Sequence, residues 1–479
     1  MKAQYLAIMM VLTVVGLLRG QSTNQNYIKS TDYKDGYTSA TIGSATAGQK
    51  VETVQYFDGL GRPIQSVGIR QGGKINGTDA DIISYTTYDG YGRQNIEYLP
   101  ISGVLNDGNF TAITPTNIGD YYYQRFSGEW ASAAVTNAYS EKLFESSPLN
   151  RVLKQAAPGE SWKMNNGHEI EFGYSSNTSS SEVKDYYVTT AFSENIYMPT
   201  LAGGTSYYAV NTLYKSITYD ENHTSGTANS TEEFKDKQGR VVMKRTYNAG
   251  IAHDTYYVYD DFGNLTYVLP PKAEPQTAIP DANKLAELCY QYKYDQRNRL
   301  VEKKIPGKGW ESIVYNKLDQ PIMTQDDNLK AQNKWLFTKY DVLGRVAYIG
   351  IKTGTTRYAE QTAADGTTSQ WVLRSAGTVT IGGVTTYYNE NATYPIITAS
   401  GPETITINYY DDYVDINGGT KPVTVYTQTP TVNTKGLSTV SKTKVLGTSN
   451  WITGVSYYDM HNRPIYSYTK NTHHAIART

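Results

Sequence analysis

A five-residue core recurs along the chain: Asp, two variable residues, Gly or Asn, then Arg, with a strand-like run after it. Self-similarity of this kind is typical of repeat architectures, in which each repeat is one supersecondary unit. The nine copies begin at Asp58, Asp89, Ser147, Asp236, Asp260, Asp295, Asn316, Asp341 and Asp459. This repeat constrains the fold more than any other feature, because one local structure must form many times over.

The fourth position of the core carries only residues that tolerate a left-handed backbone. It reads Gly61, Gly92, Asn150, Gly239, Gly263, Asn298, Asp319, Gly344 and Asn462. For other L-residues this conformation costs roughly 1–2 kcal/mol. The first position is Asp, Ser or Asn, whose side chain accepts a hydrogen bond from the backbone two residues on and so starts a type I turn. Together the two positions predict a three-residue β-hairpin loop with a bulge.

An all-β fold follows from these turns. The residue before most cores is Tyr, and Val, Ile or Leu follows them, so the flanking segments favour strands. A single hairpin is marginal in water and must cover its edges with neighbours. We therefore expect adjacent hairpins to pair in sequence order into a long coiled antiparallel sheet, a spiral shell or partial shell.

The segments between the cores also favour β structure. Residues 378–388 and 404–410 alternate in the manner of hairpin strands, whereas the Ser-rich segment 174–183 is typical of an exposed loop. One short helix is expected over 281–290, where Asp281 can cap the helix and Leu285 and Leu288 supply an apolar stripe.

The amino terminus has the shape of a signal peptide. Lys2 is followed by a mostly apolar run over residues 5–18, which is shorter than the roughly 20 residues that a membrane span needs. We therefore expect residues 1–20 to be removed and the mature chain to lack a membrane span. The expected location is extracellular, cell-surface or periplasmic.

Four ranges describe the expected organisation. After the signal peptide, residues 21–160 form an amino-terminal β domain that precedes the repeats. Residues 161–350 form the repeat β-sheet, and residues 351–479 hold further hairpins that end in the last core.

Charge and reactive residues argue against several classes of function. The formal net charge is -1, which gives no electrostatic footprint for nucleic acid. Cys289 is the only cysteine, so no intramolecular disulfide or cysteine-based zinc site can form, and the six histidines show no zinc-hydrolase spacing. We expect no enzyme activity, no cofactor and no metal. Asp411 and Asp412 leave a calcium site open as an alternative, although no regular loop spacing supports it.

The aromatic usage is strongly biased, with 44 Tyr against 9 Phe and 6 Trp. Tyr combines an apolar ring with a polar tip and suits half-exposed strands, which is the structural interpretation that we favour. The alternative is a carbohydrate-binding or adhesion module in which exposed aromatics such as Trp162, Trp310 and Trp335 stack on the sugars of a cell-surface glycan.

The repeats strongly resemble the RHS or YD-repeat superfamily of exported bacterial proteins. The resemblance extends from about Val51 to Lys470 and is most specific over 289–327 and 335–350. The opening part, including residues 54–67 and 144–159, is similar to a domain of unknown function that precedes the repeats in many such proteins.

The resemblance implies a β-sheet spiral wound into a hollow shell, which in long members encloses a carboxy-terminal toxin or effector. This sequence departs from that plan, because Thr479 follows soon after the last core, without a recognisable core-associated or cargo segment. We expect an amino-terminal portion of a shell or a short family member, with a carboxy-terminal or separate effector as cargo. Autoproteolysis cannot be carried over to any residue.

Overall fold

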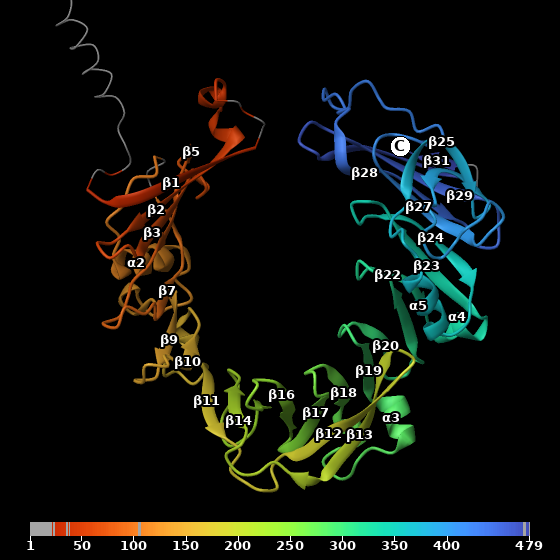
Figure 1. Cartoon of the computed structure of the whole chain (residues 1–479). Helices are drawn as coiled ribbons and strands as arrows, with labels where there is room; N and C mark the ends of the chain where they lie inside the picture. Colours follow the sequence, from red (N-terminus) through yellow and green to blue (C-terminus); the bar gives the residue numbers. More distant parts are fainter. Residues whose placement is uncertain are drawn as a thin grey trace, which may run out of the picture. The chain divides into compact units, whose positions relative to one another are not determined.

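The computed structural model describes residues 22, 24–34, 37, 39–103, 107–472 and 476–478 (Figure 1). The expected signal peptide, residues 1–20, lies outside the described residues. Clustering of backbone contacts separates two compact units. The first unit comprises the chain up to Ser176 together with Tyr214–Glu233 and Arg245–Ala252. The second unit comprises Asn177–Leu213, Phe234–Lys244 and the chain from His253 onward.

The first unit begins with a five-stranded antiparallel sheet in the order β1-β2-β3-β6-β8. Its strands are β1 (Asn26–Tyr33), β2 (Lys50–Phe57), β3 (Pro63–Ile69), β6 (Ile82–Tyr85) and β8 (Ile101–Ser102), and β4 (Lys74–Ile75) and β5 (Thr78–Asp79) form a separate small ribbon. Val54 and Val67 face each other across β2 and β3 and are fully buried. Helix α2 (Pro115–Arg125) packs Ile118 onto this core.

A second run of antiparallel strands in the first unit pairs in the order β7-β9-β10-β11-β14. The strands are β7 (Ile96–Tyr98), β9 (Tyr139–Phe144), β10 (Val152–Ala156), β11 (Ile170–Ser176) and β14 (Tyr214–Tyr219). Because β11 extends to Ser176, the expectation of a loop from residue 174 is wrong for its first three residues. The strand holds them through pairing of Tyr174 with Ser216.

The second unit is dominated by hairpins that lie side by side in sequence order from β17 to β24 (Figure 1). Strands β15 (Ser230–Lys235), β16 (Val241–Asn248) and β17 (Ile251–Tyr259) have residues in both units. The strands that follow are β18 (Leu265–Leu269), β19 (Tyr290–Asp295), β20 (Leu300–Lys304), β21 (Glu311–Tyr315), β22 (Pro321–Gln325), β23 (Lys334–Tyr340) and β24 (Val346–Thr353). Two buried clusters, one around Met243 and Tyr256 and one around Phe337 and Tyr409, form its cores.

The all-β, antiparallel prediction is confirmed, but strict pairing in sequence order is wrong at several places. In the first unit β3 pairs with β6, β6 with β8 and β7 with β9. Strand β11 pairs with β14, because the hairpin of β12 (Lys184–Ser193) and β13 (Ile196–Tyr207) lies instead against β19. Strand β24 pairs with β27, because β25 (Leu373–Ile381) and β26 (Val384–Asn389) form their own ribbon. That ribbon places Tyr388 in the core, stacked on Tyr409 at 5.5 Å between ring centroids.

The last strands again follow sequence order. They are β27 (Glu403–Asp411), β28 (Thr434–Lys444), β29 (Trp451–Tyr458), β30 (Pro464–Asn471) and β31 (Ile476–Arg478).

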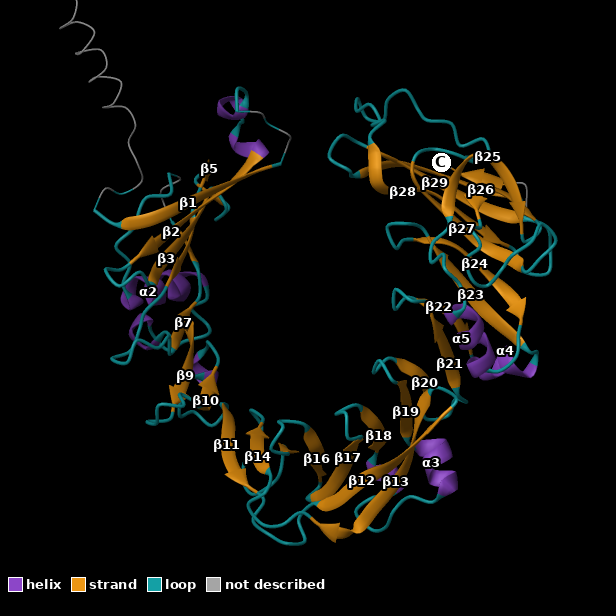
Figure 2. Ribbon diagram, in the orientation of Figure 1, coloured by secondary structure: helices purple, strands orange, loops and turns teal. Residues whose placement is uncertain are grey.

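Four α-helices interrupt the strands in the described part of the chain. The expected helix forms as α3 (Ala282–Leu288), with the Asp281 side chain accepting a hydrogen bond from Lys284 N, and Leu285 and Leu288 pack on the core. Helix α2 of the first unit and helices α4 (Asp327–Ala331) and α5 (Arg357–Asp365) of the second were not expected; α4 and α5 lie beside β21–β23 (Figure 2). Short 3-10 turns are η1 (Ile42–Ser44), η2 (Ala47–Gln49), η3 (Ala133–Val135), η4 (Glu160–Trp162) and η5 (Pro271–Ala273).

Candidate functional site

Eight of the nine cores form the same closed turn, and in the Ser147 copy Glu145 N, rather than Ser147 N, donates to Arg151 O. In the copy that begins at Asp295, Asp295 N donates to Arg299 O at 3.0 Å, and Asn298 N donates to Asp295 O at 2.9 Å. The fourth residue has positive φ in every copy: Gly61 77°, Gly92 77°, Asn150 52°, Gly239 81°, Gly263 83°, Asn298 56°, Asp319 60°, Gly344 77° and Asn462 62°. The left-handed residue lets the chain re-enter the ladder, which shifts register beside the turn.

The first residue of the core also binds the fifth, a role that sequence reasoning missed. Asp295 Oδ1 accepts from the backbone N of Arg297 and of Arg299, and Asp295 Oδ2 accepts from Arg299 Nε at 2.7 Å. The same three contacts recur in the copies that begin at Asp58, Asp89, Asp236, Asp341 and Asp459. The Asp therefore fixes both the turn and the direction in which the Arg side chain leaves it.

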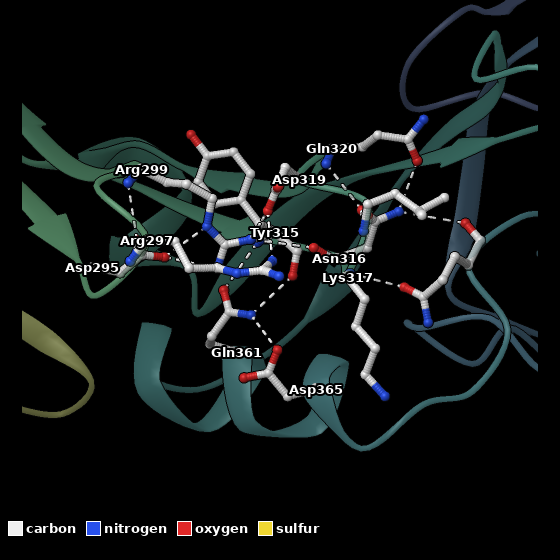
Figure 3. A network of polar contacts seen from close by, with 12 residues as sticks. Asp295, Arg297, Arg299, Tyr315, Asn316, Lys317, Asp319, Gln320, Gln361 and Asp365 are labelled. Atoms are coloured by element: carbon white, nitrogen blue, oxygen red, sulfur yellow. Dashed lines mark hydrogen bonds and ion pairs between the residues drawn. The ribbon is translucent and has the colours of Figure 1, made fainter.

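The fixed Arg reaches the next hairpin along the chain (Figure 3). The Arg299 guanidinium lies 4.8 Å from the ring centroid of Tyr315, the residue before the next core. Tyr315 Oη in turn donates to Leu300 O, directly after the Arg, at 2.8 Å. We call this pair of contacts the turn-to-turn link: Arg over the Tyr ring, and the Tyr hydroxyl on the carbonyl of the residue that follows the Arg.

The turn-to-turn link repeats through both units. The Arg residues lie over their rings in the pairs Arg62 with Tyr88, Arg151 with Tyr174, Arg240 with Tyr259, and Arg345 with Tyr410. The hydroxyls of these rings donate to the carbonyls of Pro63, Val152, Val241 and Val346. Where the fifth residue is Asn264 or Gln320, the hydroxyl bond remains, from Tyr294 to Leu265 O and from Tyr340 to Pro321 O.

Two copies vary in the groups that bind the Arg or its ring without losing the contact between hairpins. Arg93 lies over the ring of Phe144, which has no hydroxyl, and its Nη1 instead donates to Glu145 O at 3.2 Å. In the Ser147 copy, Glu145 replaces the missing carboxylate and binds Arg151 Nη2 at 2.7 Å. The hydrogen bonds from Arg151 lower the pKa of Glu145 to about 2.

Burial keeps the hydroxyls of link tyrosines protonated. Burial raises the pKa of Tyr294 to about 12 and also raises the pKa of Tyr315 and Tyr340. Hydrogen bonds from Arg345 lower the pKa of Asp411. A protonated hydroxyl is what the link requires, since a phenolate cannot donate to a carbonyl.

A side chain of helix α5 binds the backbone of Tyr315, the tyrosine of one turn-to-turn link (Figure 3). Gln361 Oε1 accepts from Tyr315 N at 3.0 Å, and Gln361 Nε2 donates to Tyr315 O at 2.9 Å and to Asp365 Oδ1. The side-chain amide thus replaces a strand partner for Tyr315. The turn that follows Tyr315 is also bound by a side chain, because Lys317 N donates to Gln370 Oε1 at 3.0 Å.

The three tryptophans considered for sugar stacking lie in different environments. Trp335 is fully buried, and its Nε1 donates to Thr355 O, so the expectation of an exposed ring is wrong. It shares the inward face of β23 with Phe337. Trp310 is partly buried, with Lys293 Nζ 4.2 Å from its ring centroid. Trp162 is 42% exposed.

The remaining candidate ligands are engaged in packing or ion pairs. Cys289 is fully buried, and burial raises the pKa of its thiol to about 11. Asp411 binds Arg345 through both oxygens, and Asp412 binds Arg374 at 2.6 Å, so the two carboxylates considered for calcium each face a guanidinium. Among the described residues, no group of three His, Cys, Asp or Glu side chains could hold a metal ion. His473 and His474 lie outside the described residues.

Within the part of the chain that the structure describes, no helix is long and apolar enough to cross a membrane.

Comparison with known proteins gives one family and a set of remote structural likenesses. Residues 29–176 match a family described as a domain of unknown function, DUF6443. No curated protein matches the chain. Similar solved structures are TcdB2-TccC3 without its hypervariable C-terminal region (13% identity, 88% of this chain, TM-score 0.39), TcdB2-TccC3-TEV (13%, 98%, 0.40) and the Photorhabdus luminescens Tc holotoxin pore (14%, 90%, 0.38). The chain spans only 19–23% of the length of these chains.

Proposed function

We propose that this chain is a non-enzymatic scaffold: a wall segment of an exported RHS/YD-repeat protein in a toxin-encapsulating or surface-interaction system. The observation that carries the proposal is the turn-to-turn link. Its Asp, Arg and Tyr side chains bind one another and the backbone, so the recurring residues of the repeat serve to hold hairpins together. A sheet tied at most of its repeated turns is suited to act as a wall.

The DUF6443 match supports the same proposal from the amino-terminal side. It covers residues 29–176, which include the segments that resemble the domain preceding the repeats in RHS/YD proteins. Export by a signal peptide over residues 1–20 and an enclosed effector as partner belong to this proposal.

Protection of a cargo tests the scaffold function. The full chain is co-expressed with the polypeptide encoded after it, and the time course of trypsin digestion of that polypeptide is compared with its digestion alone. We expect slower digestion in the presence of the chain, and faster digestion again when Gly263→Val and Gly344→Val loosen two turns. Equal digestion with and without the chain contradicts an enclosing wall.

A glycan-binding module is the second candidate, and Trp162 is the observation that favours it. Its ring is exposed, lies 5.2 Å from the His168 ring between centroids, and lines a hollow of about 400 Å³ together with Gln155 and Ser140. A glycan array with the full chain tests this candidate. Binding that Trp162→Ala abolishes and Trp310→Ala preserves supports a glycan module; no binding to any glycan contradicts it.

A further inference from the structure

A second hollow, of about 640 Å³, opens in the second unit beside the turns of two neighbouring hairpins. The turns at 236–240 and 260–264 contribute Gln238, Asp261 and Phe262, and β12 contributes Asp185 and Tyr187. These five residues take no part in a turn-to-turn link, although Arg240 and Tyr259, which form one, also line the hollow. The link chemistry therefore leaves these five side chains unexplained.

The rim of the hollow presents exposed aromatic faces. Tyr187 is 52% and Phe262 is 54% exposed. Phe262 occupies the third position of its core, where the turn requires no ring, because Gln238, Arg297 and Leu343 fill that position in other copies. Its ring contacts Tyr197 at 4.7 Å between centroids, which fixes its orientation at the rim.

The polar groups of the hollow are mainly acidic. Asp185, Asp260 and Asp261 line it, and among the described residues that line it Arg240 is the basic one. Arg240 is already neutralised by Asp236, with Nε 2.7 Å from Oδ2, and lies over Tyr259. The hollow thus carries uncompensated negative charge beside its rings.

Two of the three carboxylates are available to a ligand. Asp260 is committed to its own turn, where it accepts from Phe262 N and Asn264 N. Asp261 is exposed and makes no hydrogen bond or ion pair within the described part of the chain. Asp185 binds the Tyr208 hydroxyl, whose pKa burial and the Asp185 charge raise to about 12. Tyr208 therefore stays a hydrogen-bond donor to Asp185.

We infer that this hollow binds an organic cation, the ammonium group of a lysine in a basic segment of a partner polypeptide. Aromatic faces attract a cation through their quadrupole, and carboxylates beside them add charge attraction. A neutral apolar group would gain nothing from Asp185 and Asp261, and an anion would be repelled. The inference goes beyond the scaffold proposal and does not depend on it.

The test uses the full chain and a short peptide with one central lysine, Ac-Gly-Ser-Lys-Ser-Gly-NH2, in a ligand-observed NMR titration. The matched ligand carries norleucine, which has the same alkyl chain length without the charge. We expect saturable binding of the lysine peptide that weakens as salt rises, and several-fold weaker binding of the norleucine peptide.

Variants separate the two sources of attraction. Phe262→Leu keeps an apolar side chain without the ring face, and Asp261→Asn keeps the size without the charge; each should weaken binding by about two- to fivefold. Glu287→Gln on α3 and Leu343→Ala at another turn are matched controls and should bind as the unchanged chain does. Thermal melts establish that all four variants are folded.

Three outcomes overturn the inference: no saturable binding of the lysine peptide, equal binding of the norleucine peptide, or unchanged binding by both Phe262→Leu and Asp261→Asn. A neutral oligosaccharide that binds in place of the lysine peptide and is lost in these variants would identify a sugar site instead.

Discussion

Removing one hydroxyl from a turn-to-turn link should measurably loosen the repeat. Tyr315→Phe deletes the donor that binds Leu300 O at 2.8 Å and leaves the ring beneath Arg299. A hydrogen bond of this kind contributes about 0.5–1.5 kcal/mol net. We expect the free energy of unfolding to fall by about 1 kcal/mol, measured by urea denaturation of the full chain.

The ring and the guanidinium should be energetically coupled. Tyr315→Leu removes the ring, and Arg299→Lys keeps the charge but loses the planar group that binds Asp295 and lies over the ring. In a double-mutant cycle, the losses of the two single variants should exceed the loss of the double variant by about 0.5–1 kcal/mol, the usual size of a cation–π contact.

A tyrosine outside the links provides the control. Tyr292 is partly buried on β19, two residues before Tyr294, and its hydroxyl makes no hydrogen bond within the described residues. Tyr292→Phe should change stability little. Equal losses for Tyr292→Phe and Tyr315→Phe, or strictly additive losses in the cycle, would refute the link as a stabilising device.

Five further predictions concern the turn glycines, Cys289, Tyr294 and metal content. Gly344→Val should cost about 1–2 kcal/mol or more and Gly344→Asn much less, because φ is +77° there, while Leu343→Asn should be nearly neutral; equal losses for Val and Asn would mean close packing instead. Gly239→Val should cost about 1–2 kcal/mol from the backbone alone, since a Cβ at Gly239 meets nothing within 4 Å, whereas one at Gly344 lies 3.1 Å from Gln320 Nε2. The Cys289 thiol should react with a thiol reagent at the rate of unfolding, and fast labelling in the folded state would show that it is accessible. Because the folded pKa of Tyr294 is raised to about 12, its contribution to stability is present below pH 10 and is lost as the pH rises from about 10 to 12; tyrosinate absorbance during alkaline unfolding measures this, and Tyr294→Phe should reduce the loss. Chelation should leave the melting temperature unchanged, and a fall with release of stoichiometric zinc would show a structural metal.

The turns could be predicted because their requirement is local. A left-handed backbone at the fourth position restricts the side chain by sterics alone. The copies within this one sequence therefore show which residues are accepted there, such as Gly344 and Asn298, without an alignment. Helix α3 could be predicted for a similar reason, since the Asp281 cap and its apolar stripe lie within one short segment.

Contacts between repeats could not be predicted in the same way. Arg299 stood out as the fifth residue of its core, but its partner Tyr315 belongs to the next hairpin, and only the pairing of β20 with β21 brings them together. Trp335 had a readable signal that was missed: β23 alternates buried and partly buried residues, which places Trp335 with Phe337 inside. Helix α5 also had a signal in Thr356, which caps it by accepting from Ala359 N.

The direction of the turn-to-turn link determines where the gene can be lengthened or shortened. In the copies that begin at Asp58, Asp236 and Asp295, the link joins the Arg of one core to the Tyr before the next, so the segment that must stay intact there runs from Arg to that Tyr, such as residues 299–315. A duplication or deletion with breakpoints between two strands of that segment would separate an Arg from its Tyr. When both breakpoints fall inside turns, between the first and fifth residues of two cores, the junction joins the first residue of one core to the fifth residue of the other. The junction then keeps an Asp and Arg pair, and the links between the remaining neighbouring hairpins stay closed.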